Sequence, residues 1–107
     1  MLSATRQSNT VLFVTLSENA NDATLTQAND GGFLVKETGT PATAYVVSAT
    51  AKQGSNSNIV ELTVANMVAS AAAGVTVTYS SAGNGIIADQ TANEMATDTT
   101  GVVVAPW

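Results

Sequence analysis

The chain has 107 residues, a net charge of −5, and neither cysteine nor histidine. The missing residue types exclude disulfides, thiolate nucleophiles and the usual general base. The three cations are spread along the chain, which argues against nucleic acid or an anionic membrane surface as a partner. The apolar residues are mostly small, with 18 Ala and 13 Val against 6 Leu and 3 Ile, and Ser, Thr and Asn are abundant, so strands and turns are favoured over helices.

Alternation of apolar and polar residues with period two predicts strands along the whole chain. Residues 1–9 form an N-terminal arm or a first strand, and the predicted strands are Leu2–Arg6, Thr10–Ser17, Phe33–Glu37, Ala42–Lys52, Asn58–Val64, Gly74–Ser80 and Thr100–Ala105.

The same alternation predicts which side chains of a strand point to the same face of the sheet. In Thr10–Ser17, Leu12, Val14 and Leu16 share one face, and Phe13 lies on the other with Val11. The long strand 42–52 is expected to place four apolar side chains on one side, namely Tyr45, Val47, Ala49 and Ala51.

Turn-forming residues separate these strands. They occur at Asn29–Gly32, Thr38–Pro41, Gly54–Asn56 and Gly83–Gly85, and short helical turns are possible at Asp22–Ala28 and Asn66–Ala73. Strands of five to ten residues punctuated in this way predict an all-β antiparallel sandwich. We therefore expect one domain over residues 1–107 with about seven strands, followed by a tail at residues 105–107.

Five segments resemble a known family: Val11–Glu18, Phe33–Val35, Val60–Val64, Gly74–Tyr79 and Ile87–Asn93. They are similar to bacterial Ig-like domains of the SwmB type over roughly residues 10–104, and the VTVTY strand followed by the Asp-to-Asn turn is the most distinctive part. The family has glycine before that Asn, where this chain has Ala92, so the turn is open to a different shape. The resemblance implies an Ig-like Greek-key sandwich, and by itself it implies no single activity.

The Asp-to-Asn turn has two interpretations. Asp89 and Asn93, with Glu94, Asp98 or a backbone carbonyl, could ligate calcium through oxygen atoms. Alternatively, the side chains of Asp89 and Asn93 bridge the turn and satisfy backbone N–H groups, which is the interpretation preferred here. The acids of Glu18–Gly32 are too dispersed for a calcium loop and indicate a solvated loop.

Enzymatic activity is not expected. Serine-based catalysis lacks its histidine, and the carboxylates are neither paired nor accompanied by an aromatic sugar platform. No cofactor and no metal site are expected.

Contact surfaces are the more promising feature. Phe13 becomes part of an exposed apolar patch if the second sheet does not cover its face, and it is buried if the strand lies at an edge or bend. Trp107 either folds back over the end of the sandwich or docks into a neighbour, and docking is the favoured of the two positions. The predicted interface residues are Met1, Leu2, Arg6, Phe13 and Trp107.

Two roles fit these features. The first is a structural protein on the outside of a tailed-phage capsid, a decoration or cement protein held by the major capsid protein and by neighbouring copies of itself, with trimers as a natural arrangement. Such a protein would be synthesised in the host cytoplasm, in keeping with a start, MLSATRQSNT, that lacks the features of a secretory signal. The alternative is a spacer or ligand-binding Ig-like domain of a bacterial surface protein or adhesin, with calcium as one ligand.

Overall fold

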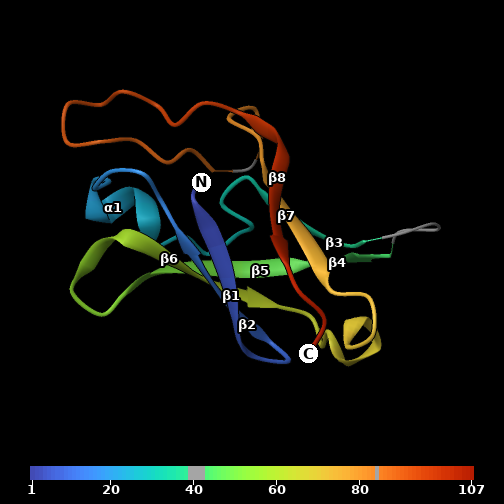
Figure 1. Cartoon of the computed structure of the whole chain (residues 1–107). Coiled ribbons are helices and arrows are strands. Elements are labelled where there is room, and N and C mark those ends of the chain that lie inside the picture. Colours follow the sequence, from blue (N-terminus) through green and yellow to red (C-terminus); the bar gives the residue numbers. More distant parts are fainter. Residues whose placement is uncertain (39–42, 84) are drawn as a thin grey trace.

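The computed structural model describes residues 1–38, 43–83 and 85–107, and it consists of two antiparallel four-stranded sheets packed face to face (Figure 1). The strands are β1 (Ser3–Ser8), β2 (Val11–Thr15), β3 (Phe33–Glu37), β4 (Ala44–Tyr45), β5 (Val47–Gln53), β6 (Asn56–Val64), β7 (Val75–Tyr79) and β8 (Asp98–Val104). One sheet has the order β1-β2-β6-β5 and the other β4-β3-β7-β8. This is the strand order of an immunoglobulin-like Greek-key sandwich, so the predicted fold class is confirmed.

The predicted strand at residues 42–52 is wrong as a single element. The chain leaves one sheet after Tyr45 and enters the other at Val47, with the exposed Val46 between them, and this division adds an eighth strand to the expected seven. A bulge after Val47 then shifts the alternation, so that Thr50 points into the core in place of Ala49. The Thr50 hydroxyl is satisfied there because it donates a hydrogen bond of 2.7 Å to the Leu25 carbonyl.

Both predicted helical turns are present in shortened form. Helix α1 (Asp22–Leu25) begins after Asn21, whose side chain accepts a hydrogen bond of 3.1 Å from the Ala23 N–H as an N-cap. The second turn is the 3₁₀ helix η1 (Val68–Ser70). The predicted turn residues 39–41 and 84, and the predicted strand residue Ala42, lie outside the described part of the chain.

The core lies between the two sheets, where alternate residues of facing strands point inward. On β2 and β6, Leu12 lies directly opposite Leu62 and Val14 opposite Val60, and all four side chains have no exposed surface. On the other sheet Phe33 lies opposite Tyr79, with ring centroids 5.2 Å apart. Val75, Val77 and Tyr79 are buried as the alternation predicts. The small aliphatic residues of the sequence are therefore sufficient to fill a two-layer core.

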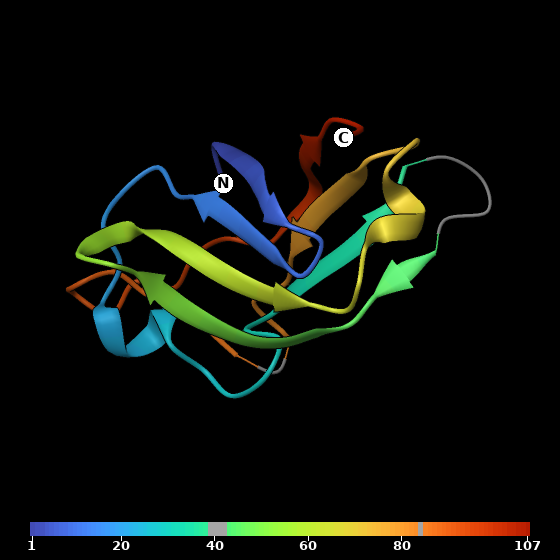
Figure 2. The ribbon, with the colours of Figure 1, turned by 90° about the horizontal axis from the view of Figure 1, so that it is seen from below.

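The loops divide between the two ends of the sandwich, as Figure 2 shows. One end carries α1, the β5–β6 turn and the long loop from β7 to β8; this end is called the loop end below. The opposite end carries η1 and the C-terminus. The phenol oxygen of Tyr79 anchors the long loop by accepting a hydrogen bond of 3.0 Å from the Ile87 N–H. Burial of this phenol raises the pKa of Tyr79.

Candidate functional site

The turn at Asp89–Asn93 is organised around the Asp89 carboxylate. Oδ1 accepts hydrogen bonds of 2.9 Å from the N–H groups of Thr91 and Asn93, and Oδ2 accepts one of 3.1 Å from the Asn93 side-chain amide. These bonds lower the pKa of Asp89, with the Asn93 N–H as the largest cause. The preferred interpretation, in which the two side chains bridge the turn, is confirmed by these contacts. Ala92, at the position of the family's glycine, has a φ of 65°.

The four residues considered for calcium do not form one site. Glu94 is exposed and lies in an isolated bridge with Ala88, while Asp98 begins β8 and accepts a hydrogen bond of 2.7 Å from the Gly101 N–H. Within residues 1–38, 43–83 and 85–107 no group of three or more Asp or Glu side chains is arranged to hold a metal ion. The Asp89 oxygen atoms are also already engaged by the turn.

A small cavity of about 50 Å³ opens beside this turn. The segment after β2 forms one wall and the loop before β8 the other; the polar lining comes from Ser17, Glu18, Asn19, Asp89 and Asn93, and the apolar lining includes Leu16, Ile87 and Met95. A space of this size holds a few water molecules.

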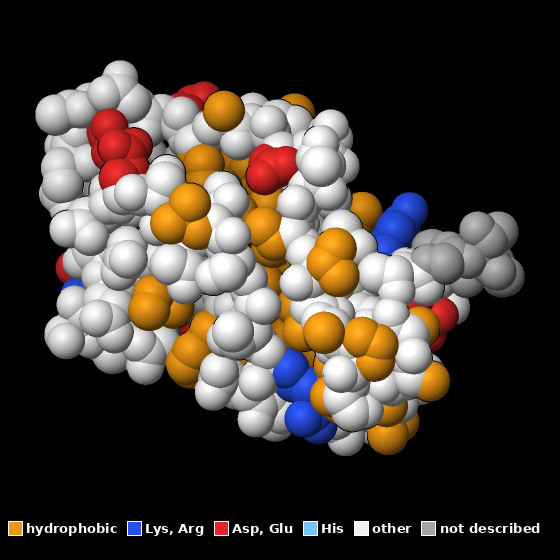
Figure 3. Space-filling model, in the orientation of Figure 1, with side chains coloured by type: hydrophobic (Ala, Val, Ile, Leu, Met, Phe, Trp, Pro, Cys, Tyr) orange, Lys and Arg blue, Asp and Glu red, His pale blue; other side chains and the backbone are white. Residues whose placement is uncertain are grey.

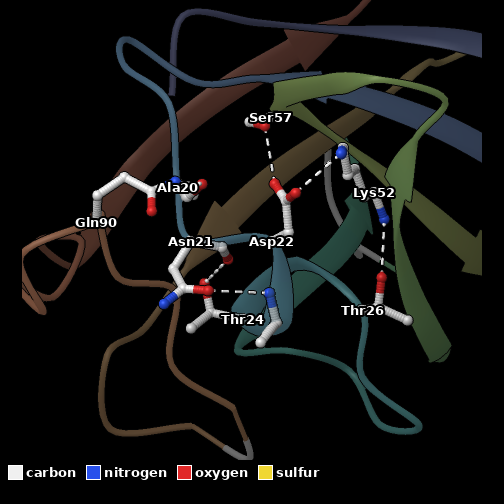
Figure 4. Close-up of polar contacts among 9 residues, drawn as sticks. Ala20, Asn21, Asp22, Thr24, Thr26, Lys52, Ser57 and Gln90 are labelled. Carbon is white, nitrogen blue, oxygen red and sulfur yellow. Dashed lines mark hydrogen bonds and ion pairs between the residues drawn. The ribbon is translucent and has the colours of Figure 1, made fainter.

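A polar cluster at the loop end joins three segments that are distant in the sequence (Figure 4). Asp22 of α1 accepts a hydrogen bond of 2.9 Å from the Lys52 ammonium and one of 2.8 Å from the Ser57 hydroxyl. Gln90 of the long loop donates to the Ala20 carbonyl at 3.1 Å. Lys52, followed by Ser57, lowers the pKa of Asp22. Sequence reasoning missed this cluster, because Asp22 and Lys52 are 30 residues apart and nothing local to either predicts the pair.

A second polar cluster lies at the opposite end of the sandwich. The Tyr45 hydroxyl donates to Glu37 Oε1 at 2.6 Å, and the buried Ser70 hydroxyl donates to the same oxygen at 3.3 Å. The bond to Glu37 raises the pKa of Tyr45, so the phenol stays a donor. The cluster fastens β3 and β4 to η1, and it contains no histidine that could act as a general base for the serine.

The predicted interface residues at the two chain ends contact each other. The Arg6 guanidinium lies 4.9 Å from the centroid of the Trp107 ring, and the backbone N–H of Trp107 donates a hydrogen bond of 2.9 Å to the Ala71 carbonyl. The indole packs against the core, so Trp107 folds back over the end of the sandwich, which is the less favoured of its two predicted positions. Docking of Trp107 into a neighbour is not required for its order.

The remaining N-terminal residues line the edge where the two sheets meet. Met1 packs against the core, and its amino group lies 3.9 Å from the Asp98 carboxylate, while Leu2 is 64% exposed. Strands β1 and β8 lie beside each other here, and Figure 3 shows apolar atoms in the seam between them.

Phe13 lies on the solvent face of its sheet. The core-facing residues Leu12 and Val14 flank it in the sequence, and the other sheet covers only their side. Phe13 is half-buried among its neighbours on the solvent face, and so are Val11 and Ile59. The structure thus places the side chain on an open face, which is the condition stated above for an exposed apolar patch.

Charge is unevenly distributed along the molecule. Six of the eight acidic residues lie in or at the ends of the two long loops, namely Glu18, Asp22, Asp30, Asp89, Glu94 and Asp98. On the face seen in Figure 3 most acidic side chains lie toward the loop end, and the larger groups of basic side chains lie away from it. The other end of the sandwich, with Arg6 and Lys36, therefore carries almost none of the net negative charge.

The described residues contain no helix whose length and apolar character would allow it to cross a membrane. Comparisons of the chain with protein-family models, with curated proteins and with solved structures found no match. The resemblance to SwmB-type domains accordingly stays a prediction.

Proposed function

We propose that this chain is a non-enzymatic structural protein, held by its neighbours as a decoration or cement protein on the outside of a tailed-phage capsid. The observation that carries the proposal is the open apolar face on β2 and β6, where Val11, Phe13 and Ile59 are half-buried without a covering layer. An aromatic side chain at the centre of such a face is typical of a surface that a partner covers.

The assignment to a virion rests further on the SwmB-type resemblance, because single copies of such domains occur on virion proteins. Its partners would be the major capsid protein and neighbouring copies. The acidic loop end then suits the side turned to solvent, since a surface with net charge resists nonspecific association.

The proposal is tested on particles of the source phage. Negative-stain microscopy of particles lacking the gene should show the loss of surface protrusions. In particles carrying the variant Phe13→Glu we expect the protein to be absent from the shell, whereas the control Ser55→Glu, which adds the same charge at an exposed turn, should be incorporated normally. Unaltered particles without the gene would refute the virion role, and equal incorporation of both variants would refute the role of the Phe13 face.

The alternative is a spacer or ligand-binding Ig-like domain of a bacterial surface protein, and its ligand would bind at the Asp89–Asn93 turn and the small cavity beside it. A ligand that binds only the folded chain raises its melting temperature with concentration. A calcium titration followed by thermal unfolding separates the two: a rise in melting temperature that is lost in Asp89→Asn supports the alternative, and no rise at millimolar calcium removes its calcium form.

A further inference from the structure

Each sheet turns one face to solvent, and on the described residues each of these faces carries one charged side chain. On the β1-β2-β6-β5 sheet this residue is Glu61, which lies between Phe13 of β2 and Ala51 of β5 in the strand register. Its neighbours on β2 and β6 are apolar or hydroxyl-bearing, namely Val11, Thr15, Ile59 and Thr63, and the Gln7 amide lies at the β1 edge, where it donates to the Thr5 hydroxyl.

The other solvent face has the opposite charge. Its charged residue is Lys36, which lies between Thr76 of β7 and Ala44 of β4. Leu34 and Val103 on this face are 44% and 66% exposed. Within the described chain neither Glu61 nor Lys36 takes part in an ion pair.

The two charged residues also lie on corresponding strands of the two sheets. Strand β1 lies beside β8, and the chain passes directly from β4 into β5, so the order β1-β2-β6-β5 lies over the order β8-β7-β3-β4. Strand β6 and strand β3 are therefore both second from the same side of the slab. A copy stacked along the normal to the slab would place its β6 over the β3 of the first copy, and a shift along the strands that aligns the two residues would bring Glu61 of one copy near Lys36 of the other.

We propose that the partner covering these faces is a second copy of this chain, stacked head to tail so that the Glu61 face of one copy meets the Lys36 face of the next. Opposite charges then meet among apolar and hydroxyl-bearing side chains. If two copies instead met through the same face, Glu61 would lie opposite Glu61, or Lys36 opposite Lys36, and the like charges would repel.

The geometry also sets the strength and form of the contact. Four strands about 4.8 Å apart, each contributing about five residues of 3.3 Å, give a face on the order of 300 Å². A standard interface buries about 800 Å² per partner, so the association is weak in dilute solution. Because the two faces point in opposite directions, the stack does not close on itself and grows as an open series.

The proposal extends the structural role proposed above, in which neighbouring copies are partners, but it is tested on the purified chain without any particle. Failure of the stack therefore leaves the virion role to be decided by the microscopy.

Sedimentation velocity of the wild-type chain, from micromolar to millimolar concentration, should show an average mass that rises without a plateau. The rise should be smaller at high salt. Glu61→Lys alone and Lys36→Glu alone each place like charges at the contact, so each should weaken association at least about tenfold.

An equal mixture of the two single variants is the decisive sample. In the mixture each variant presents the charge that the other lacks, so association should return to about the wild-type level, and the double variant Glu61→Lys/Lys36→Glu should behave likewise. Glu94→Lys, at an exposed residue of the loop end, changes the net charge by the same two units as Glu61→Lys and serves as its control. Thermal unfolding checks that each variant is folded.

A second measurement needs no variant. Dilution of the labelled wild-type chain should shift the amide resonances of Phe13, Glu61, Lys36 and Thr76 and leave those of the loop end unchanged. A chain that is monomeric at every concentration, a plateau at a closed dimer or trimer, or single variants that associate as the wild type does would each overturn the proposal.

Discussion

The substitution Gly101→Ala tests the packing of β8 most directly. Gly101 has a φ of +72° and lies where β8 bulges against β7, because Val77 pairs with Val102 but Tyr79 pairs with Asp98. A Cβ at this position would lie 2.2 Å from the Val77 carbonyl oxygen. Since the obstacle is backbone, the two strands have to separate.

Two effects add in this variant, and Gly54→Ala isolates the first of them. Gly54 has a φ of +55°, and a Cβ there would meet nothing within 4 Å. Its replacement by alanine should therefore destabilise the fold by only the left-handed backbone term of about 1 kcal/mol. Gly101→Ala should lose the same amount and about 1–3 kcal/mol more from overpacking, for a total of about 2–4 kcal/mol.

Urea unfolding followed by circular dichroism, with the fluorescence of the single tryptophan, Trp107, as a second probe, measures both free energies of unfolding. The informative quantity is the difference between the two variants. If Gly101→Ala were no more destabilising than Gly54→Ala, the close approach of β8 to the Val77 carbonyl would be refuted.

Three further predictions concern the turn, the core and pH. Ala92→Gly should stabilise the chain by about 1 kcal/mol in the same urea assay, because Ala92 has a φ of 65° and glycine adopts this conformation without strain. A loss of stability would contradict the left-handed backbone conformation at this turn. Leu62→Ala should reduce the free energy of unfolding by about 2–5 kcal/mol, since Leu62 has no exposed surface. Thr63→Ala, at the exposed neighbouring residue, should change it by less than about 0.5 kcal/mol. Equal effects of the two substitutions would place Leu62 outside the core. The folded pKa of Asp89 is lowered from the value of 3.8, so its stabilisation is present above that pH and is lost as the pH falls through the folded pKa. Asp89→Asn should therefore lower the urea midpoint at neutral pH and flatten its decline in acid; an unchanged acid decline would contradict the hydrogen bonding of this carboxylate.

Much of the fold could be predicted from local pattern. Alternation over 10–17, 58–64 and 74–80 identified three strands and their buried faces, because successive side chains of a strand point to opposite sides regardless of what the strand later packs against. The Asp89 turn was also predictable from neighbouring residues, since an Asp side chain accepts hydrogen bonds from N–H groups two and four residues further along the chain.

The remainder depended on long-range packing. The sequence by itself determined an all-β chain with alternating apolar strands, an acidic surface and a self-bridged turn, because each of these follows from composition or from neighbours within a few residues. Only the tertiary structure decided that the chain changes sheets at Val46, that Thr50 replaces Ala49 in the core, and that Arg6 meets Trp107. Contacts of this kind join residues that no local preference connects, and they form only once the two sheets pack together.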